Sequence, residues 1–482
     1  MNYTLLGFLL YLVLIVLVGF ATYRFNKSHY DYFLAGRRLN PWVVAFSERA
    51  SGESAWVLIG LPGAAYAIGL LEFWSALGCV LGILAYWKLI AQKLRQESED
   101  LGAITLPDFF AQKYPTLAKP IRLTALTIIV FFFIFYLAAQ FNGVGVVFKV
   151  TFGISPVWGV AIGAAMIVFY TMMGGFLAVA WTDMIQGLIM IGALVILPVV
   201  GLVHIAEQHK SIAVAVELQG AAYASFTGGN RGWAGLAVVI SGLSWGLGYF
   251  GQPHLLVRFM SIDHAHNIRI SRRIAYAWAI PAFAGAFLIG LVGLTYYGSG
   301  AFDDVEHIMP ALARDLLPAW LAGIFVSGAI AAMMSTADSQ LLTVTSSVIE
   351  DFYHKTLSRR TIEPAQLLKA GRAITVLIGM LALAIALSST ERIYHLVSYA
   401  WGGLGASFGP ALLLALWWRG TRPAGILAGM LSGSVVTFVW TNHEHLDAAV
   451  SGRLVAWLVA FAFVLAFSLI QGKFFPDAGK KA

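Results

Sequence analysis

The sequence predicts an all-α polytopic membrane protein with about 13 transmembrane helices. Hydrophobic residues make up 59% of the 482 residues and charged residues only 11%, whereas soluble domains carry about 25% charged residues. The apolar residues occur in long continuous runs, many of them close to the roughly 20 residues that a helix needs to cross a bilayer. A soluble enzyme and a disordered protein are therefore excluded, and the short alternating segments of a membrane β-barrel are not seen.

Thirteen apolar runs can be placed along the chain. The first has no preceding basic residue and no small-residue cleavage site, so we interpret it as a retained span rather than a signal peptide. The loops are too short for a soluble domain, and the one cysteine, Cys79, excludes a disulfide framework. The predicted spans are 3–23, 42–69, 72–92, 123–149, 155–173, 176–205, 233–257, 275–297, 318–348, 371–388, 393–417, 424–441 and 453–471.

The distribution of basic residues predicts the orientation. Thirteen spans place the two termini on opposite sides of the membrane. Six alternate segments hold 24 of the 31 Lys and Arg residues, and the intervening loops hold only five. Because cytoplasmic loops are the ones enriched in Lys and Arg, we expect a protein of the cell (inner) membrane with its N-terminus outside and its C-terminus cytoplasmic. The basic segments are 24–40, 88–122, 258–273, 349–372, 419–422 and 473–482.

Two of the predicted spans are interrupted at corresponding places. The second contains a polar run, 47–54, followed by Gly60 and Pro62, and the seventh contains a glycine-rich run that ends in Pro253. Gly and Pro are unfavourable inside helices, although both are frequent in membrane helices. Because polar residues fall at the same places, we interpret the interruptions as broken helices facing a cavity. Paired breaks of this kind indicate inverted repeats.

These breaks predict the organisation of the chain as one transmembrane domain over residues 1–482. Counted from the second span, the broken helices are the first and the sixth of ten. The expected parts are a leading helix and cytoplasmic loop (1–40), a first five-helix repeat (41–205), a second repeat (233–417), and two trailing helices with the C-terminal tail (418–482).

The ninth span contains a polar face. Ser335, Asp338 and Ser339 share one side of a helix by their spacing, and oxygen ligands of this kind suit a hard cation such as Na⁺. Hydroxyls can also bond to helix carbonyls, but a carboxylate inside a membrane costs about 2.5–3.5 kcal/mol. Asp183, in the sixth span, is the other lone acid, and it could instead cap a helix end.

At these positions the sequence resembles the sodium:solute symporter family, and within it the bacterial sodium/proline symporters. The resemblance runs from about residue 31 to about residue 418, and several independent motifs occur in the family's order. They are DYFLAGR at 31–37, GLPG at 60–63, TLPDF at 105–109, GGFLAV at 174–179, WTD at 181–183, the run from Trp245 to Pro253, MST at 334–336 and SYAW at 398–401.

The resemblance implies two inverted five-helix repeats that work by alternating access, with Na⁺ as the coupling ion. Its implied Na⁺ site consists of the backbone carbonyls of Ala50, Glu53 and Ala332 and the hydroxyls of Ser335 and Thr336. Some relatives have a second Na⁺ site, and its matching positions here are Asp183, Ser335, Asp338 and Ser339.

The resemblance also implies a substrate site between the broken helices. Aromatic faces can pack a small ring and a cationic amine, and the N-terminus of a half-helix can receive a carboxylate. Ordinary packing is the alternative role of each aromatic residue. The matching positions are Ser54, Trp56, Tyr136, Trp245, Tyr249, Gln252 and Pro253, and Gln140 adds a polar group to the span that holds Tyr136.

The chain departs from the proline symporters at several positions. They have an Asp where this chain has Gly52, and a Ser where it has Asp338. Three charges, Glu48, Arg49 and Glu53, stand instead in the first broken helix. Arg49 and Glu53 are four residues apart and can pair on one helix face. The pair is either structural, or one of the two glutamates offers a carboxylate to the cavity.

The predicted function is therefore secondary active transport and not enzymatic catalysis. We expect Na⁺-driven uptake of a small solute, proline first and then another small amino acid or compact zwitterion. The expected partners are the solute, Na⁺ and the lipid bilayer, without nucleic acid or an obligate protein partner. The alternatives are a proton-coupled carrier of another small solute, a transporter-like membrane sensor, and a cation channel, which would need a through-pore with ring symmetry.

Overall fold

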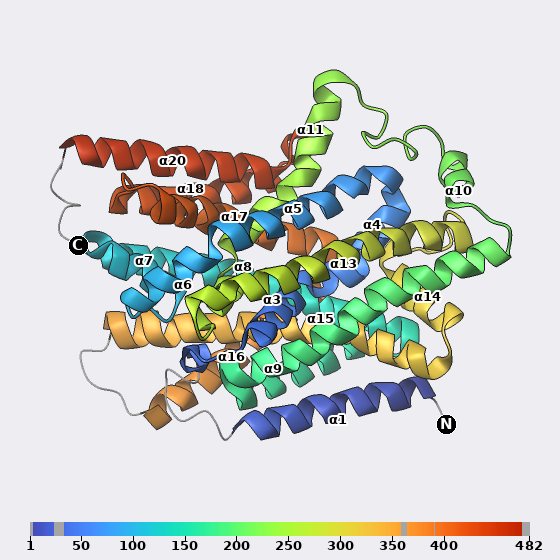
Figure 1. Ribbon diagram of the computed structural model, residues 1–482, viewed down its shortest axis with the longest axis horizontal. Helices are drawn as coiled ribbons and strands as arrows, with labels where there is room; N and C mark the ends of the chain where they lie inside the picture. The colour runs from blue at the N-terminus through green and yellow to red at the C-terminus, as the bar shows by residue number, and fades with distance from the viewer. Residues whose placement is uncertain (1–2, 24–32, 358–363, 390, 475–482) are drawn as a thin grey trace.

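The computed structural model describes residues 3–23, 33–357, 364–389 and 391–474, and this part of the chain is helical apart from turns and one isolated bridge pair. Long helices run side by side along the long axis of the molecule (Figure 1). Ten helical stretches in the described residues are long and apolar enough to cross a membrane, with shorter apolar helices at Leu5–Ile15 and Pro156–Met172. The all-helical membrane class is confirmed, whereas the number of 13 crossings stays a prediction.

The first half of the chain contains the first broken helix. Here η denotes a short 3₁₀- or π-helix. The elements are α1 (Tyr3–Tyr23), η1 (Ala35–Arg37), α3 (Pro41–Ala55), η2 (Trp56–Gly60), α4 (Leu61–Ile68), η3 (Gly69–Glu72), α5 (Phe73–Leu89), α6 (Ala91–Asp100), α7 (Leu106–Lys113), η4 (Pro115–Leu117), α8 (Ala118–Phe152), α9 (Pro156–Glu207) and α10 (Ile212–Leu218).

The second half contains the second broken helix and the two trailing helices. The elements are α11 (Gly232–Leu243), η5 (Ser244–Gly251), α12 (Pro253–Ser261), η6 (Ala265–Asn267), α13 (Ile268–Tyr297), η7 (Val305–His307), α14 (Ile308–Leu316), α15 (Ala319–Ser346), η8 (Ser347–Leu357), α16 (Pro364–Ser388), α17 (Ile393–Trp417), α18 (Pro423–Thr441), α19 (Glu444–Ala449) and α20 (Gly452–Phe474).

Local sequence explains where several helices begin. The side chain of Asn40 accepts the N–H of Trp42 at 2.9 Å, and Pro41 occupies the first turn of α3. Thr105 caps α7 in the same way, because its hydroxyl accepts the N–H of Asp108 at 3.1 Å. Such side chains satisfy N–H groups that have no partner within the helix, and Pro is tolerated where no N–H is needed.

The backbone breaks lie within the two interrupted spans. Ser54, near the end of α3, has φ 53° and ψ −168°, a conformation that costs energy for a residue with a side chain. In the second half, α11 tightens into the 3₁₀-helix η5, and Gln252 is extended before α12 begins. A third break falls at Gly175 (φ 63°, ψ 177°), so that α9 comprises the two predicted spans 155–173 and 176–205.

The two broken helices are joined at one end of the bundle. Leu39, just before α3, pairs with Ile262, just after α12, and the N–H of Leu39 donates to the carbonyl of Ser261 at 3.2 Å.

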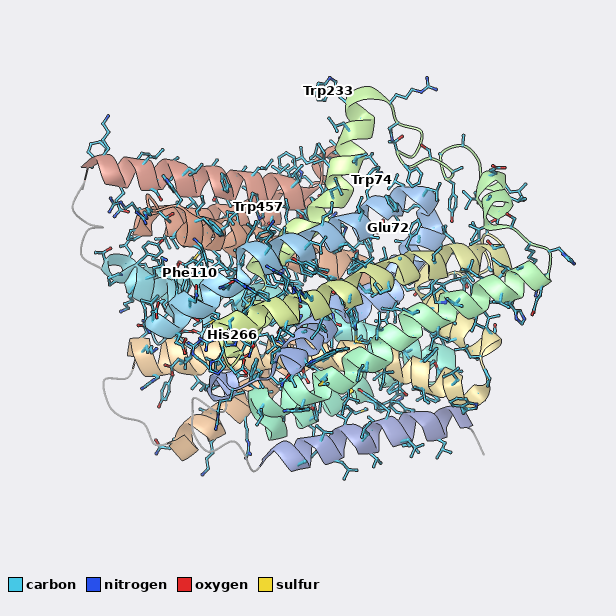
Figure 2. All side chains as sticks on the ribbon, in the orientation of Figure 1. Glu72, Trp74, Phe110, Trp233, His266 and Trp457 are labelled. Carbon is cyan, nitrogen blue, oxygen red and sulfur yellow. The ribbon has the colours of Figure 1, made fainter. Side chains whose placement is uncertain are left out.

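Figure 1 shows that α1 begins at one end of the molecule and α20 ends at the other. Trp233, in α11, lies at the edge of the molecule (Figure 2). Among the ten long stretches, those of α15 and α17 are the most buried and that of α20 is the least.

Candidate functional site

The break in α3 is closed by nearby side chains. The N–H of Ala55 donates to Oε1 of Gln140 at 3.0 Å, and the N–H of Trp56 donates to the hydroxyl of Ser54 at 3.2 Å. The Tyr136 hydroxyl lies 3.5 Å from that of Ser54. Gln140 and Tyr136 are one turn apart on α8, so this helix presents two polar groups to the opened backbone.

The break at η5 comes together with the break in α3. The rings of Trp56 and Trp245 stack with their centroids 4.4 Å apart. Tyr249, one turn after Trp245, packs edge-on against Trp401 of α17 at 4.6 Å. Gln252 donates from Nε2 to the carbonyls of Gly248 and Trp401, whereas its Oε1 is buried without a partner in the described part of the chain. Such an orphaned acceptor needs an explanation, and a bound solute is one.

Pro253 is placed differently from the other predicted substrate residues. It begins α12 at the position where its missing N–H is harmless. It also borders a separate small cavity of about 20 Å³, together with Thr105, Phe176 and Ser346 among others. None of the rings described above lines this cavity.

The predicted Na⁺ ligands lie where α3 meets α15. The hydroxyl of Ser335 donates to the carbonyls of Ala50 at 3.1 Å and Ala332 at 3.0 Å. Thr336 donates instead to the carbonyl of Ser51 at 3.0 Å, and the carbonyl of Glu53 accepts the N–H of Trp56. Several hard oxygen donors therefore gather beside the break, which is the donor chemistry that Na⁺ prefers.

The predicted second Na⁺ site holds an arginine. Nη2 of Arg258, on α12, lies 2.8 Å from Oδ2 of Asp183 and 2.5 Å from the hydroxyl of Ser339. The assignment of Arg258 to a cytoplasmic loop starting at residue 258 is therefore wrong, because α12 extends to Ser261 and the Arg258 side chain is fully buried. Arg258 is buried because the apolar residues around it in α12 pack in the core of the protein.

More than one carboxyl group lies around the single guanidinium of Arg258. Ser47 donates to Oδ2 of Asp183 at 2.7 Å, but Oδ1 of Asp183 and Oδ2 of Asp338 are buried without a hydrogen-bond partner among the residues that the structure describes. Asp183 lies within α9, far from either end, so it does not cap this helix. Two carboxyl groups therefore share one guanidinium, and ionisation of both would leave one negative charge unmatched. A buried excess charge of this kind favours a further cation or a proton.

A second buried charge cluster occupies α3. Arg49 donates from Nε to Glu48 at 2.7 Å and from Nη1 to Glu53 at 2.6 Å, and all three side chains are fully buried. The predicted pairing of Arg49 with Glu53 is present, with Glu48 as an additional partner. The hydroxyl of Tyr249 donates to Oε2 of Glu53 at 3.2 Å, and Trp87 donates to Glu48 at 3.0 Å. Glu53 therefore touches an aromatic residue of the second break.

Comparison with known proteins identifies the family. The model of the sodium:solute symporter family matches residues 32–433. The chain belongs to the sodium:solute symporter family. A sodium/proline symporter of Salmonella typhimurium is 38% identical over 92% of this chain and 88% of its own length. The high-affinity proline transporter PutP of Bacillus subtilis is 38% identical over 89% of this chain and 90% of its own length.

Solved structures share the fold of this symporter. The substrate-bound, outward-open structure of a Na⁺-coupled sialic acid symporter has a TM-score of 0.74 and 18% identity, covering 96% of this chain and 98% of its own. The nucleobase-cation symporter Mhp1 has a TM-score of 0.54 and 15% identity, covering 95% and 98%. The predicted resemblance and the fold class of a helical symporter are therefore confirmed.

The structure adds residues to the site that sequence reasoning missed. His254 is fully buried, and its ring packs edge-on against Phe133 and Tyr136. It directly follows Pro253, so its position beside a predicted break was a usable signal. Trp401 ends the SYAW motif, but the motif alone does not show that Trp401 contacts Tyr249. Arg258 lacks such a signal, because its role depends on helices that are distant in sequence.

Proposed function

We propose that this symporter takes up proline together with Na⁺. The observation that carries the proposal is the meeting of the two broken helices at the Trp56–Trp245 stack, next to the oxygen donors of α3 and α15. A small saturated ring can pack against an aromatic face. The relatives at 38% identity are named for proline, and the family couples solutes to sodium.

In the proposed mechanism, Na⁺ binds the carbonyls of Ala50, Glu53 and Ala332 and the hydroxyls of Ser335 and Thr336. The bound ion would draw the oxygens of α3 toward those of α15 and so hold the broken helix against its neighbour. The aromatic residues at the two breaks would then already be arranged to bind the solute. Bound Na⁺ would raise the affinity for the solute, and bound solute would raise the affinity for Na⁺ by the same factor.

The solute contacts follow from the groups around the two breaks. Trp56, Trp245 and Tyr249 would pack the ring of proline, while Gln252 Oε1 is a buried acceptor that an ammonium group can satisfy. Ser54, Tyr136 and Gln140 would hold the opened end of α3. His254 would lie behind Tyr136.

We also propose that a second Na⁺ binds among Asp183, Ser335, Asp338 and Ser339. The supporting observation is the pair of unpartnered carboxylate oxygens beside a single guanidinium. Na⁺ and Arg258 would share Asp183, so the guanidinium must shift when the ion enters. A proton on Asp338 would balance the charge equally well, which makes proton coupling the alternative.

Uptake of labelled proline into proteoliposomes tests the function. We expect uptake when an inward Na⁺ gradient is imposed and none when K⁺ replaces Na⁺ at the same membrane potential. A proton gradient without Na⁺ separates the two coupling ions. Failure of proline to enter under either gradient would contradict the proposal. A thermal-shift screen of small amino acids with and without Na⁺ would then identify the solute, because a ligand stabilises the state that it binds.

A further inference from the structure

Arg453 reaches the aromatic stack from outside both predicted repeats. It stands in the first turn of the trailing helix α20. Its Cζ lies 4.3 Å from the ring centroid of Trp245, within the range of a cation–π contact. Gly402 of α17 makes room for this approach, because a Cβ at residue 402 would lie 2.9 Å from Cγ of Arg453. The least buried of the ten long stretches thus contributes a cation to a buried aromatic stack.

Three nitrogen donors at this contact have no acceptor among the described residues. One nitrogen of Arg453, Nη1, donates to the hydroxyl of Ser398, but Nε is buried without a partner. The indole nitrogens of Trp56 and Trp245 are also buried without a hydrogen-bond partner in the described residues, and the hydroxyl nearest to that of Trp245 belongs to Tyr394. These donors come from η2, η5 and α20. Unpaired buried N–H groups are rare and each costs about 1–3 kcal/mol, so three in contacting side chains point to a missing acceptor.

A negative group also lies beside the same aromatic residues, and its charge interacts with that of Arg453. Glu72, in η3 at the turn before α5 (Figure 2), is buried and accepts the hydroxyl of Tyr394 at 3.3 Å. The ring of Tyr394 packs edge-on against Trp245 at 5.3 Å. The surroundings of the stack therefore offer nitrogen donors with one cation from one helix and a carboxylate from another. This arrangement complements a zwitterion.

We propose that Arg453 and the indole N–H groups of Trp56 and Trp245 bind the carboxylate of the transported solute. The proposal rests on the proposed function, because that function supplies a solute with a carboxylate. A guanidinium recognises a carboxylate by charge and by parallel N–H donors. The trailing helix would thus select among solutes, although it belongs to neither repeat.

Binding of proline and of prolinamide tests this assignment. Prolinamide keeps the ring and the amine but lacks the anionic carboxylate. In thermal-shift titrations of the purified protein at saturating Na⁺, we expect Arg453→Gln to weaken proline binding by about tenfold or more, with prolinamide binding unchanged. Trp245→Phe, which keeps a ring and removes the N–H, should weaken proline binding selectively but less. Arg231→Gln, at an exposed position on α11's N-cap, is the matched control.

Other outcomes would overturn the assignment. Equal losses of proline and prolinamide binding in Arg453→Gln would mean that Arg453 only holds α20 against the core, and unchanged proline binding would remove it from the site. If Arg453→Gln does not fold, Arg453→Lys decides, because it keeps the charge and loses Nε–H. If the wild type binds other amino acids instead of proline, the same comparison uses that acid and its amide. If it binds no carboxylate solute, the proposed function fails as well.

Discussion

At the scale of single residues, the cluster of Glu48, Arg49 and Glu53 shows how a buried arginine is stabilised by acidic partners. Arg49 bonds to both glutamates, so the cluster has two acidic side chains for one guanidinium. Gly52, where the proline symporters have an Asp, is nearby: a Cβ at residue 52 would lie 3.6 Å from Nη2 of Arg49. The second acidic side chain of the cluster is therefore near the position of the missing acid.

Glu53→Gln tests whether the second acidic side chain of the cluster contributes to Na⁺ binding. We expect the variant to fold, because Arg49 keeps its bonds to Glu48, and we expect the Na⁺ concentration for half-maximal uptake to rise about fivefold or more. Removing a charge a few ångströms from a cation weakens their attraction by about 1 kcal/mol or more. Trp87→Phe is the control, since it removes the hydrogen bond to Glu48 and keeps both glutamates. Wild-type Na⁺ dependence of Glu53→Gln would leave the cluster a structural role only.

At the scale of elements, the contact of α3 with α15 places the hydroxyls of Ser335 and Thr336 against backbone carbonyls. We expect Ser335→Ala and Thr336→Ala each to weaken apparent Na⁺ affinity by about tenfold or more, because even indirect partners of a metal ion can matter that much. Proline affinity at saturating Na⁺ should change less. Ser327→Ala is the matched control, because Ser327 is buried on the same helix and its hydroxyl donates only to the carbonyl of Gly323. Unchanged Na⁺ dependence in both test variants would refute the assignment.

Another element contact joins η7 to α17. The carboxylate of Glu306 accepts the N–H groups of Ile393 and Tyr394 at the N-terminus of α17, at 3.3 and 3.2 Å. Burial raises the pKa of Glu306 from 4.5 to about 7, with a further increase from Asp304 and a partial offset from the two N–H groups and Arg392. Protonation is therefore more favourable in the folded state than in the unfolded state.

A pH series of thermal unfolding measures this effect. A raised carboxyl pKa stabilises the fold below about pH 4.5, and this contribution disappears as the pH rises through about 7. We therefore expect the Tm of wild type to fall more than that of Glu306→Gln between pH 5 and 8. Comparison of the two proteins cancels other titrating groups such as His307. Glu391→Gln, at an exposed neighbouring position, should keep the wild-type slope. Parallel curves for wild type and Glu306→Gln would contradict the assignment.

At the scale of the whole molecule, the first and last described helices have their outer ends at opposite faces of the bundle (Figure 1). We expect the face with η6 and the start of α13 to be cytoplasmic, because basic residues gather there. Arg269→Cys should then resist an impermeant thiol reagent in intact cells, and Gln219→Cys should react. Both positions are exposed, and the native Cys79 is buried and supplies no background. The reverse labelling pattern would invert the orientation.

The sequence by itself determined the features that depend on local composition and spacing. Apolar runs predict helices in a membrane, the polar and glycine-rich runs mark the breaks at Ser54 and before Pro253, and helical spacing puts Arg49 beside Glu53. Only the tertiary structure decided which distant side chains meet. Arg258 joins Asp183 across 75 residues of chain and Arg453 reaches Trp245 from the trailing helix. Such partners depend on how separate helices pack. The hydropathy of a sequence does not show which residue of another helix contacts a buried charged side chain.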